Sequence, residues 1–254
     1  MSITKEAELT GMKRVSEIVG TTLRMMREYA AIGMSTKELD AYGAAILKGY
    51  GAKSAPFETY GFPGFCCISV NEEVAHGIPS ENKILKEGDL INIDVSAEFD
   101  GYWSDNGGSF VIGSDICNHQ PLVDASRYIL RKAIAKIRSG VLISDIGQIM
   151  ESEANKMHFK VIRNLAGHGV GKSLHEEPEN ILNYRVRSNK ERFRRNTTCA
   201  IETFISTTST MAVVLSDGWT LVGNKGGYIA QHEHTVLVTD EEPVILTESN
   251  GIFM

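Results

Sequence analysis

LINIDVSAEFDGYWSDNGGSFV, residues 90–111, predicts a β-hairpin. Apolar and polar residues alternate with a period of two along its first half, which is typical of a strand. The apolar members are Ile91, Ile93, Val95 and Ala97, and the polar members are Asn92, Asp94, Ser96 and Glu98. Asp100-Gly101 is a favoured two-residue hairpin turn, so we expect Tyr102–Val111 to return antiparallel to the first strand.

The register of this hairpin would bring two carboxylates together. If the loop contains two residues, the numbers of cross-strand partners sum to 201, and Asp94 faces position 107. Asp105 then lies on the same face as a diagonal neighbour, with backbones about 7–8 Å apart. Two acids this close repel each other unless a positive group lies between them, so a shared cation is one interpretation. A polar strand surface in contact with solvent is the other, and a bulge at the turn would shift the register.

Three further residues favour the interpretation that Asp94 and Asp105 share a cation. His168 stands in the glycine-rich stretch Gly167–Gly171, a predicted loop where backbone can approach a ligand closely. Glu202 is surrounded by apolar residues, an environment that is hostile to an unpaired carboxylate. Glu233 lies between two histidines, just ahead of an apolar strand. Two Asp, two Glu and one His form an oxygen-rich set that suits Mn, Fe or Co better than a closed structural zinc site.

The rest of the chain predicts an α/β protein with an internal repeat. Apolar residues at helical spacing predict a helix from about Leu9 to Gly33, and a Ser35–Glu38 capping box opens a second helix that ends near Gly49 or Gly51. A similar pair of helices is expected later, followed by strands, at about Asp124–Ile137, Ile146–Met157, Lys160–Ile162, Ala200–Ile205 and Val236–Val238. The spacing from glycine to the next apolar helix position is the same in both pairs, which indicates two pseudo-equivalent halves. We interpret residues 1–254 as one domain, with halves of approximately 1–120 and 121–254.

Composition narrows the class of protein. The chain has 254 residues, a net charge of −6 and four cysteines, two of them adjacent. No apolar run approaches the roughly 20 residues of a membrane helix. Charged residues in the first thirty positions leave no apolar core for a signal peptide. Few cysteines in a chain of this length are typical of a reducing compartment, so we expect a cytoplasmic protein that does not contact membranes.

One segment is strongly basic although the net charge of the chain is negative. It spans Arg185–Arg195 and is opposed only by Glu191; its cations are Arg185, Arg187, Lys190, Arg192, Arg194 and Arg195. A solvated surface loop is the simpler interpretation. Docking to an anionic partner is the alternative.

Five motifs, in order along the chain, resemble those of type I methionine aminopeptidases. They are Asn71–Pro79, Asn92–Val95, Gly167–Gly171, His175–Pro178 and Glu233–Thr235. The resemblance covers essentially the whole chain and implies the pita-bread fold of that family. This is an α/β (α+β) arrangement of pseudo-two-fold halves around a central antiparallel sheet flanked by helices.

The resemblance also implies an activity and a metal centre. The activity would be removal of the N-terminal methionine from nascent proteins when the second residue is small. Two divalent ions (Co, Mn, Fe or Zn) would be bound by Asp94, Asp105, His168, Glu202 and Glu233, with Asp105 and Glu233 bridging both. By the same resemblance, Glu202 would also move protons, and the other site residues would contact the substrate. These are His76 and His175 at the peptide group and Phe62, Cys67 and Trp219 around the methionine side chain.

Two positions depart from the family next to metal ligands. Asn106 follows Asp105 where the family usually has Thr, and Thr203 follows Glu202 where Pro is usual. Either substitution could change the hydrogen bonds behind the ligands. Asn196 stands where a glycine turn is typical, and Asn tolerates left-handed geometry.

The expected partners are N-termini of nascent polypeptides, with the ribosome as a possible anionic partner of the basic segment, and the protein is expected to be a monomer. Two alternatives stay open. One is a proline-specific aminopeptidase of the same fold, although such enzymes usually carry an additional N-terminal domain. The other is a non-catalytic binding protein on the same fold, although such relatives typically lose metal ligands.

Overall fold

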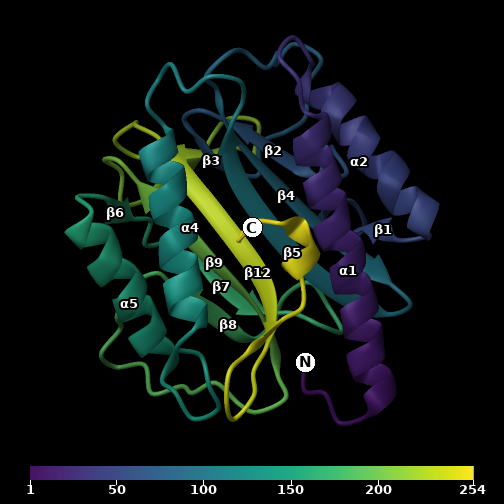
Figure 1. Cartoon of the computed structure of the whole chain (residues 1–254), viewed down its shortest axis with the longest axis vertical. Coiled ribbons are helices and arrows are strands. Elements are labelled where there is room, and N and C mark those ends of the chain that lie inside the picture. The colour runs from purple at the N-terminus through teal and green to yellow at the C-terminus, as the bar shows by residue number, and fades with distance from the viewer. Residues whose placement is uncertain (254) are drawn as a thin grey trace.

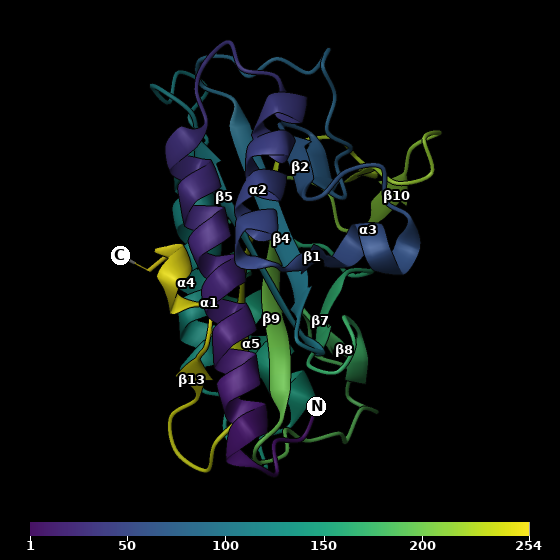
Figure 2. The same cartoon turned by 90° about the vertical axis from the view of Figure 1, so that its right-hand side faces the viewer.

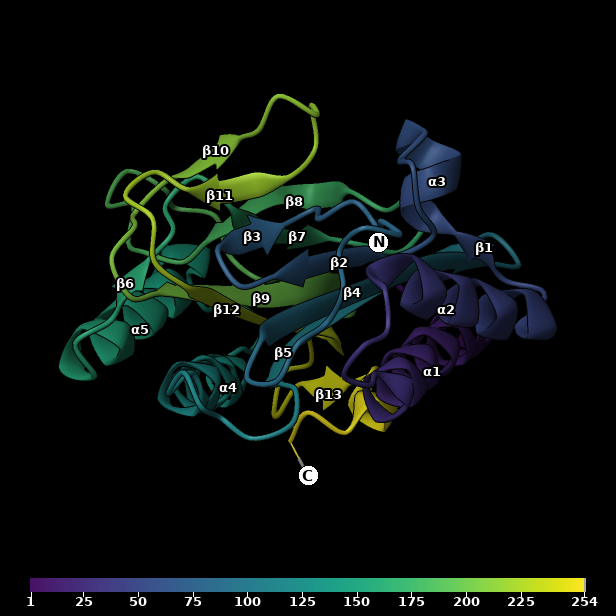
Figure 3. The same ribbon diagram turned by 90° about the horizontal axis from the view of Figure 1, so that it is seen from above.

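The computed structural model describes residues 1–253 and shows one large antiparallel sheet with its main helices on one face (Figure 1). Viewed from above, α1 (Glu6–Tyr29), α2 (Thr36–Tyr50), α4 (Gln120–Ile134) and α5 (Ile143–Lys156) lie beneath the sheet (Figure 3). The short helix α3 (Ala55–Tyr60) and the strand pair β10 (Ala212–Val214) and β11 (Leu221–Gly223) lie above it. The opposite face of the sheet is therefore left for a site.

The path through the ten-stranded sheet runs β1-β4-β5-β12-β9-β7-β8. The strands β2, β13 and β6 pair at the sides of β4, β12 and β9, and β10, β11 and β3 form a separate small sheet. The remaining bounds are β1 Lys53–Ser54, β2 Cys67–Val70, β3 Glu73–Ala75, β4 Leu90–Phe99, β5 Tyr102–Val111, β6 Lys160–Val161, β7 Ala166–Gly169, β8 Glu176–Leu182, β9 Thr198–Ser206, β12 Ile229–Leu237 and β13 Val244–Ile245.

The first helix pair covers the half of the sheet around β4 (Figure 2). Ser35 caps α2 with the predicted reciprocal hydrogen bonds to Glu38, and Gly51 closes the helix in left-handed geometry. The first helix ends at Tyr29, earlier than predicted from Gly33, because Gly33 instead donates its N–H to the Leu85 carbonyl. Apolar side chains of both helices pack on Ile91, Ile93 and Val95, and this burial holds β4 in place.

The second pair covers the half around β9 and β12. The helix α4 begins and ends several residues earlier than predicted. Asp115 accepts the N–H groups of His119 and Gln120, which starts the helix early, and bonds of the i to i−3 kind after Ile134 end it. The strand β9 extends beyond its predicted range at both ends, whereas β12 begins at Ile229, well before the predicted Val236, and ends at Leu237, one residue before the predicted Val238. Both strands are buried along their whole length.

The seam between β5 and β12 joins the two helix-covered regions. Within residues 1–253 these strands share one ladder pair, Gly108 with His232. Beyond that pair, two side-chain hydroxyls bridge the strands. Ser109 Oγ accepts from the Gln231 N–H at 2.9 Å and donates to the Gln231 carbonyl at 3.0 Å, while Thr235 Oγ1 accepts from the Asp105 N–H at 3.1 Å and donates to the Asp105 carbonyl at 2.7 Å. The division into two halves remains an interpretation, but the sheet is continuous across this seam.

None of the described helices combines the length and apolar character required to cross a membrane.

Candidate metal centre and substrate cavity

The β4–β5 hairpin places two carboxylates on the open face of the sheet. The observed register is the predicted one: Asp94 pairs with Gly107, and Ser96 pairs with Asp105. Asp100 and Gly101 both have positive φ, 52° and 78°, as a two-residue turn of this type requires. Asp94 and Asp105 are therefore diagonal neighbours on one face.

The two glutamates face each other across β9 and β12, where Glu202 pairs with Glu233. Glu233 lies inside a nine-residue strand, not ahead of one as predicted. The strand extends to Ile229 because polar Gln231, Glu233 and their neighbours are buried at the site or against the helices, so they do not mark a strand end. His232 and His234 belong to the helix side, where they contact Ser126 and Thr247.

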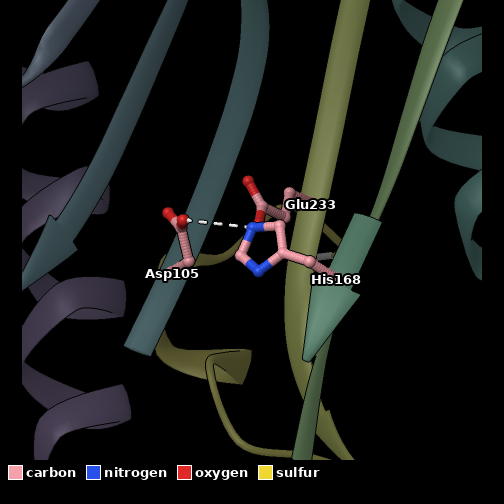
Figure 4. A group of neighbouring side chains, drawn as sticks. All are labelled: Asp105, His168 and Glu233. Carbon is pink, nitrogen blue, oxygen red and sulfur yellow. Dashed lines mark ion pairs between the residues drawn. The ribbon is translucent and has the colours of Figure 1, made fainter. Parts of the chain in front are cut away.

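His168 completes the cluster from β7, which is a strand and not the predicted loop. Gly167 and Gly169 permit this because a Cβ atom would lie 2.4 Å from the Ala200 carbonyl oxygen or 2.2 Å from that of Glu177. The imidazole Nδ1 donates to the Gly169 carbonyl at 3.0 Å, so the Nε2 lone pair is free. Nε2 points to Asp105, 3.8 Å from Oδ2 (Figure 4).

The cluster carries strong electrostatic strain without a cation. Burial and the neighbouring carboxylates raise the pKa values of Asp105, Glu202 and Glu233 well above their usual range. Burial raises the pKa of Asp94 to about 6. Burial, together with His175, lowers the pKa of His168 to about 4, so its ring is neutral at pH 7. A bound cation would favour the ionised form of these buried carboxyl groups over the protonated form. The neutral imidazole is already in the form that binds a cation.

Unpartnered atoms show where a cation fits. Asp105 Oδ1 and Glu233 Oε1 are buried and have no hydrogen-bond partner among the described residues. Ligand atoms from Asp105, His168 and Glu233 all lie within 4.8 Å of one another. Two carboxylate oxygens and one imidazole nitrogen suit Mn²⁺, Fe²⁺, Co²⁺ or Zn²⁺, so the residues present fit a divalent cation.

A cavity of about 460 Å³ opens above the cluster. All ten residues that the sequence predicted for the site line it: Phe62, Cys67, His76, Asp94, Asp105, His168, His175, Glu202, Trp219 and Glu233. Phe62 meets the Trp219 ring edge-on, with centroids 5.3 Å apart. The structure thus brings together an apolar compartment and the acidic cluster in one cavity.

His76 and His175 lie in the same cavity but outside the acidic cluster. The His76 backbone has φ of 53°, a left-handed conformation that His adopts only where the surroundings impose it. Burial lowers the pKa values of both imidazoles. Both are therefore neutral hydrogen-bonding groups at pH 7, beside the cation position.

Sequence reasoning missed two residues of the site. The Tyr60 hydroxyl lies 2.6 Å from His175 Nδ1 and orients that ring. Gln231 donates a hydrogen bond to Glu233. Gln231 precedes Glu233 by two residues and so shares its face, a signal that the late predicted start of β12 concealed. No comparable sequence signal marks Tyr60.

The unusual residues beside the ligands face away from the cluster. Asn106 donates to the Val95 carbonyl at 2.9 Å and accepts from Asn250, and the Thr203 hydroxyl lies 2.9 Å from that of Ser126. Both therefore join the sheet to the helix side. Asn196 adopts the left-handed geometry expected of it, with φ of 60°. The basic segment Arg185–Arg195 does not line the cavity.

Comparisons with known proteins agree with this geometry. The model of metallopeptidase family M24 matches residues 10–240. Methionine aminopeptidase 2 of Bacillus subtilis is 45% identical over 248 residues, covering 98% of this chain and 100% of that protein. A methionine aminopeptidase of Staphylococcus epidermidis is 39% identical over 249 residues, covering 98% and 99%.

Solved structures divide into two groups. Methionine aminopeptidase from Thermotoga maritima has a TM-score of 0.92 at 35% identity, covering 97% of this chain and 99% of that chain. The prolidase from Pyrococcus horikoshii has a TM-score of 0.77 at 21% identity, and the match covers 96% of this chain but 63% of the prolidase. The prolidase likeness shows a shared fold.

Proposed function

The chain belongs to metallopeptidase family M24, and we propose that it removes the N-terminal methionine from polypeptides whose second residue is small. Full-length similarity to methionine aminopeptidases supports this activity of a metallo-exopeptidase. The observation that carries the proposal is the juxtaposition, in one cavity, of an acidic cluster and an apolar compartment. The first can hold a divalent cation, and the second can hold a thioether side chain.

The residues that would hold the cation are Asp94, Asp105, His168, Glu202 and Glu233. The unpartnered Asp105 and Glu233 oxygens support this assignment. We propose two ions, of Co, Mn, Fe or Zn, because four carboxylates and one imidazole offer up to eight oxygens and one nitrogen, more donor atoms than the six positions of one octahedral ion. When bound, such ions supply Lewis-acid polarisation of the scissile carbonyl and activation of water for attack.

Glu202 is proposed as the group that moves protons. Its carboxylate lies in the cavity opposite Glu233, where it can take a proton from the attacking water and deliver it to the leaving amine. His76 and His175 are proposed to donate hydrogen bonds to the substrate's peptide group and stabilise the developing negative charge. Tyr60 supports His175, because a phenol that donates to Nδ1 leaves the proton on Nε2.

The apolar compartment is proposed to select methionine. Phe62, Cys67 and Trp219 offer no charge partner, so an N-terminal Lys or Glu would lose its hydration without compensation. The free amino terminus of the substrate is favoured by the acidic cluster beside it. Specificity for a small second residue is supported by similarity to the named methionine aminopeptidases rather than by a measured cleft width.

The cellular setting forms a separate part of the proposal. We propose a cytoplasmic monomer that acts on nascent chains, with the basic segment Arg185–Arg195 facing the ribosome. All six cations of that segment are exposed, which supports contact with a polyanion. The basic segment lies outside the cavity, so docking and cleavage can occur together.

A panel of tripeptides tests the activity. Chelator-treated protein is reloaded with Mn²⁺ or Co²⁺, and release of the first amino acid is measured. We expect Met-Ala and Met-Gly peptides to be cleaved well, and Met-Leu and Met-Lys peptides poorly. Preference for Xaa-Pro peptides would support a proline-specific peptidase instead. No cleavage with any metal would favour a binding protein of the same fold.

A further inference from the structure

A buried amide network lies one layer below the acidic cluster. Gln231, Asn92 and Ser109 are 2%, 5% and 5% exposed. They share the open face of the sheet with Asp94, Asp105 and Glu233, because each is an even number of residues from a member of the cluster along its strand: Asn92 is two from Asp94, Gln231 two from Glu233 and Ser109 four from Asp105. Buried polar side chains are usually hydrogen-bonded. In this network the polar atoms that face the glutamates are hydrogen-bonded.

Asn92 fixes the orientation of the Gln231 amide. Asn92 Nδ2 donates to the Gln231 backbone carbonyl at 3.3 Å, which identifies it as the nitrogen, and to Gln231 Oε1 at 2.7 Å. Oε1 is thereby held toward Asn92, and Nε2 must face the glutamates. Nε2 donates to Glu233 Oε2 at 3.0 Å. The other oxygen of Glu233, Oε1, has no partner among residues 1–253.

Gly107 supplies the space for this arrangement. A Cβ atom at position 107 would lie 2.3 Å from Gln231 Oε1 and 2.6 Å from Nε2. Gly107 is also the cross-strand partner of Asp94. The amide therefore lies directly over the hairpin backbone, and it reaches Glu233 only because this residue has no side chain.

We infer that Gln231, held by Asn92 over Gly107, is a positioning residue that orients the Glu233 carboxylate toward a divalent cation. The amide bonds one oxygen of Glu233 and leaves the other without a partner among residues 1–253, in a cluster where ligand atoms of Asp105, His168 and Glu233 lie within 4.8 Å of one another. The inference rests on the proposed function, in which Glu233 is a metal ligand. Partners behind metal ligands typically contribute 10–100-fold to metal affinity or activity.

Gln231→Met tests the inference by removing the amide while keeping the length of the side chain. Chelator-treated full-length protein is titrated calorimetrically with Mn²⁺, and the visible spectrum of the Co²⁺ form is recorded. We expect the Mn²⁺ dissociation constant to rise about tenfold or more, and the Co²⁺ bands to change. Gln148→Met makes the same change on the exposed side of α5 and should bind Mn²⁺ as the unmodified chain does.

Gly107→Ala provides a second variant that keeps every hydrogen-bonding group. Its added methyl displaces the Gln231 amide, so Mn²⁺ affinity should fall in the same direction. Gly108→Ala is the matched control, because a Cβ atom there would meet Ile252 on the helix side. Thermal unfolding of each metal-free variant reports whether it folds, and Gln231→Met decides the question if Gly107→Ala does not.

Two failures can be told apart. If the unmodified chain binds no Mn²⁺ in the cavity, the proposed function is wrong. If the unmodified chain binds Mn²⁺ and Gln231→Met binds it equally or more tightly with an unchanged Co²⁺ spectrum, the positioning role of Gln231 is wrong while the proposed function stands.

Discussion

Single residues in this site differ in how completely their polar atoms are bonded. The Glu233 carboxylate has one oxygen bonded to Gln231. Its other oxygen and Asp105 Oδ1 have no hydrogen-bond partner in the described part of the chain. An unpaired buried oxygen costs free energy, about 1–3 kcal/mol for a neutral group and more for a charged one. These unpartnered oxygens therefore lower the stability of the metal-free protein. A bound cation would remove this free-energy cost.

Glu202→Gln tests the proton-moving role. The substitution keeps the shape of the side chain but removes a negative charge and a proton acceptor. We expect kcat on a Met-Ala tripeptide to fall at least about 100-fold, the lower end of the usual contribution of general acid–base catalysis, with an unchanged circular dichroism spectrum. Glu179→Gln removes a charge from the rim of the same cavity and should retain activity. A fully active Glu202→Gln would exclude Glu202 from the mechanism.

His76→Ala and His175→Ala separate substrate contacts from metal ligands. Neither imidazole belongs to the acidic cluster, so both variants should bind Mn²⁺ like the unmodified chain but turn over slowly. Elemental analysis after dialysis measures the metal, and steady-state kinetics measure turnover. The assignment is wrong if either variant loses the metal while Glu202→Gln keeps it.

Much of the residue set could be predicted because its signals are local or repeated. Alternation of side chains placed Asp94 and Asp105 on one face, and the two-residue turn fixed their register. Gln231 and Tyr60 escaped prediction for physical reasons. The function of Gln231 depends on a buried contact with Asn92, distant in sequence, and that of Tyr60 on the approach of α3 to His175.

At the scale of elements, types could be predicted better than boundaries. The β4–β5 hairpin and the α2 cap depend on neighbouring residues and were predicted closely. The end of α1 depends on a hydrogen bond from Gly33 to Leu85, and β7 depends on close backbone approach to β8 and β9. Such contacts form only in the folded chain, so the local pattern does not contain them.

The basic segment Arg185–Arg195 is an element whose role can be tested separately from catalysis. Reversal of Arg192, Arg194 and Arg195 to Glu should leave tripeptide cleavage unchanged, because none of them lines the cavity. Binding to ribosomes should weaken, and the difference from the unmodified chain should shrink as salt rises. Cosedimentation at several salt concentrations measures this.

A matched control reverses Lys13, Arg14 and Lys48, which are exposed on α1 and α2, to Glu. Net charge then changes by the same amount in both variants. Equal loss of ribosome binding in both would indicate a general charge effect, and a large loss on tripeptides in the first would place the basic segment in the active site.

For the whole molecule, the acidic cluster couples stability to pH. Its acids have raised pKa values in the fold, with Asp94 at about 6 and the others well above their usual range. Above about pH 4 these four acids thus bind more protons in the metal-free fold than in the unfolded chain, and the stability that they contribute falls as pH rises through the folded pKa values. The buried histidines oppose this trend only at lower pH. The pKa is about 4 for His168 and about 3 for His232 and His234. The stability that these neutral histidines contribute is lost as pH falls below about 6.5, the pKa of an unfolded histidine, and it is constant above that pH.

We therefore expect the metal-free Tm to fall between pH 6.5 and 8.5, and saturating Mn²⁺ to raise Tm more at pH 8.5 than at pH 6.5. A cation at 100 times its dissociation constant contributes about 2.7 kcal/mol of stability. Differential scanning calorimetry with chelator or with Mn²⁺ measures both effects. A flat metal-free Tm with an equal Mn²⁺ gain at both pH values would contradict the linkage.

The seam between β5 and β12 has a bearing on ancestry. Ser109 binds the backbone of Gln231, and Thr235 binds the backbone of Asp105. Moving 126 positions along the chain converts Ser109 to Thr235 and Asp105 to Gln231, so the two contacts join corresponding positions of β5 and β12. If a shorter gene encoded a single half, two copies of its product could have formed a dimer through this strand pair. Each copy would have contributed one hydroxyl residue that bonds the backbone of the other copy. Gene duplication and fusion would then have freed these hydroxyl residues to diverge into Ser and Thr. Their backbone partners would have diverged into Asp105, a proposed metal ligand, and Gln231, which donates a hydrogen bond to Glu233.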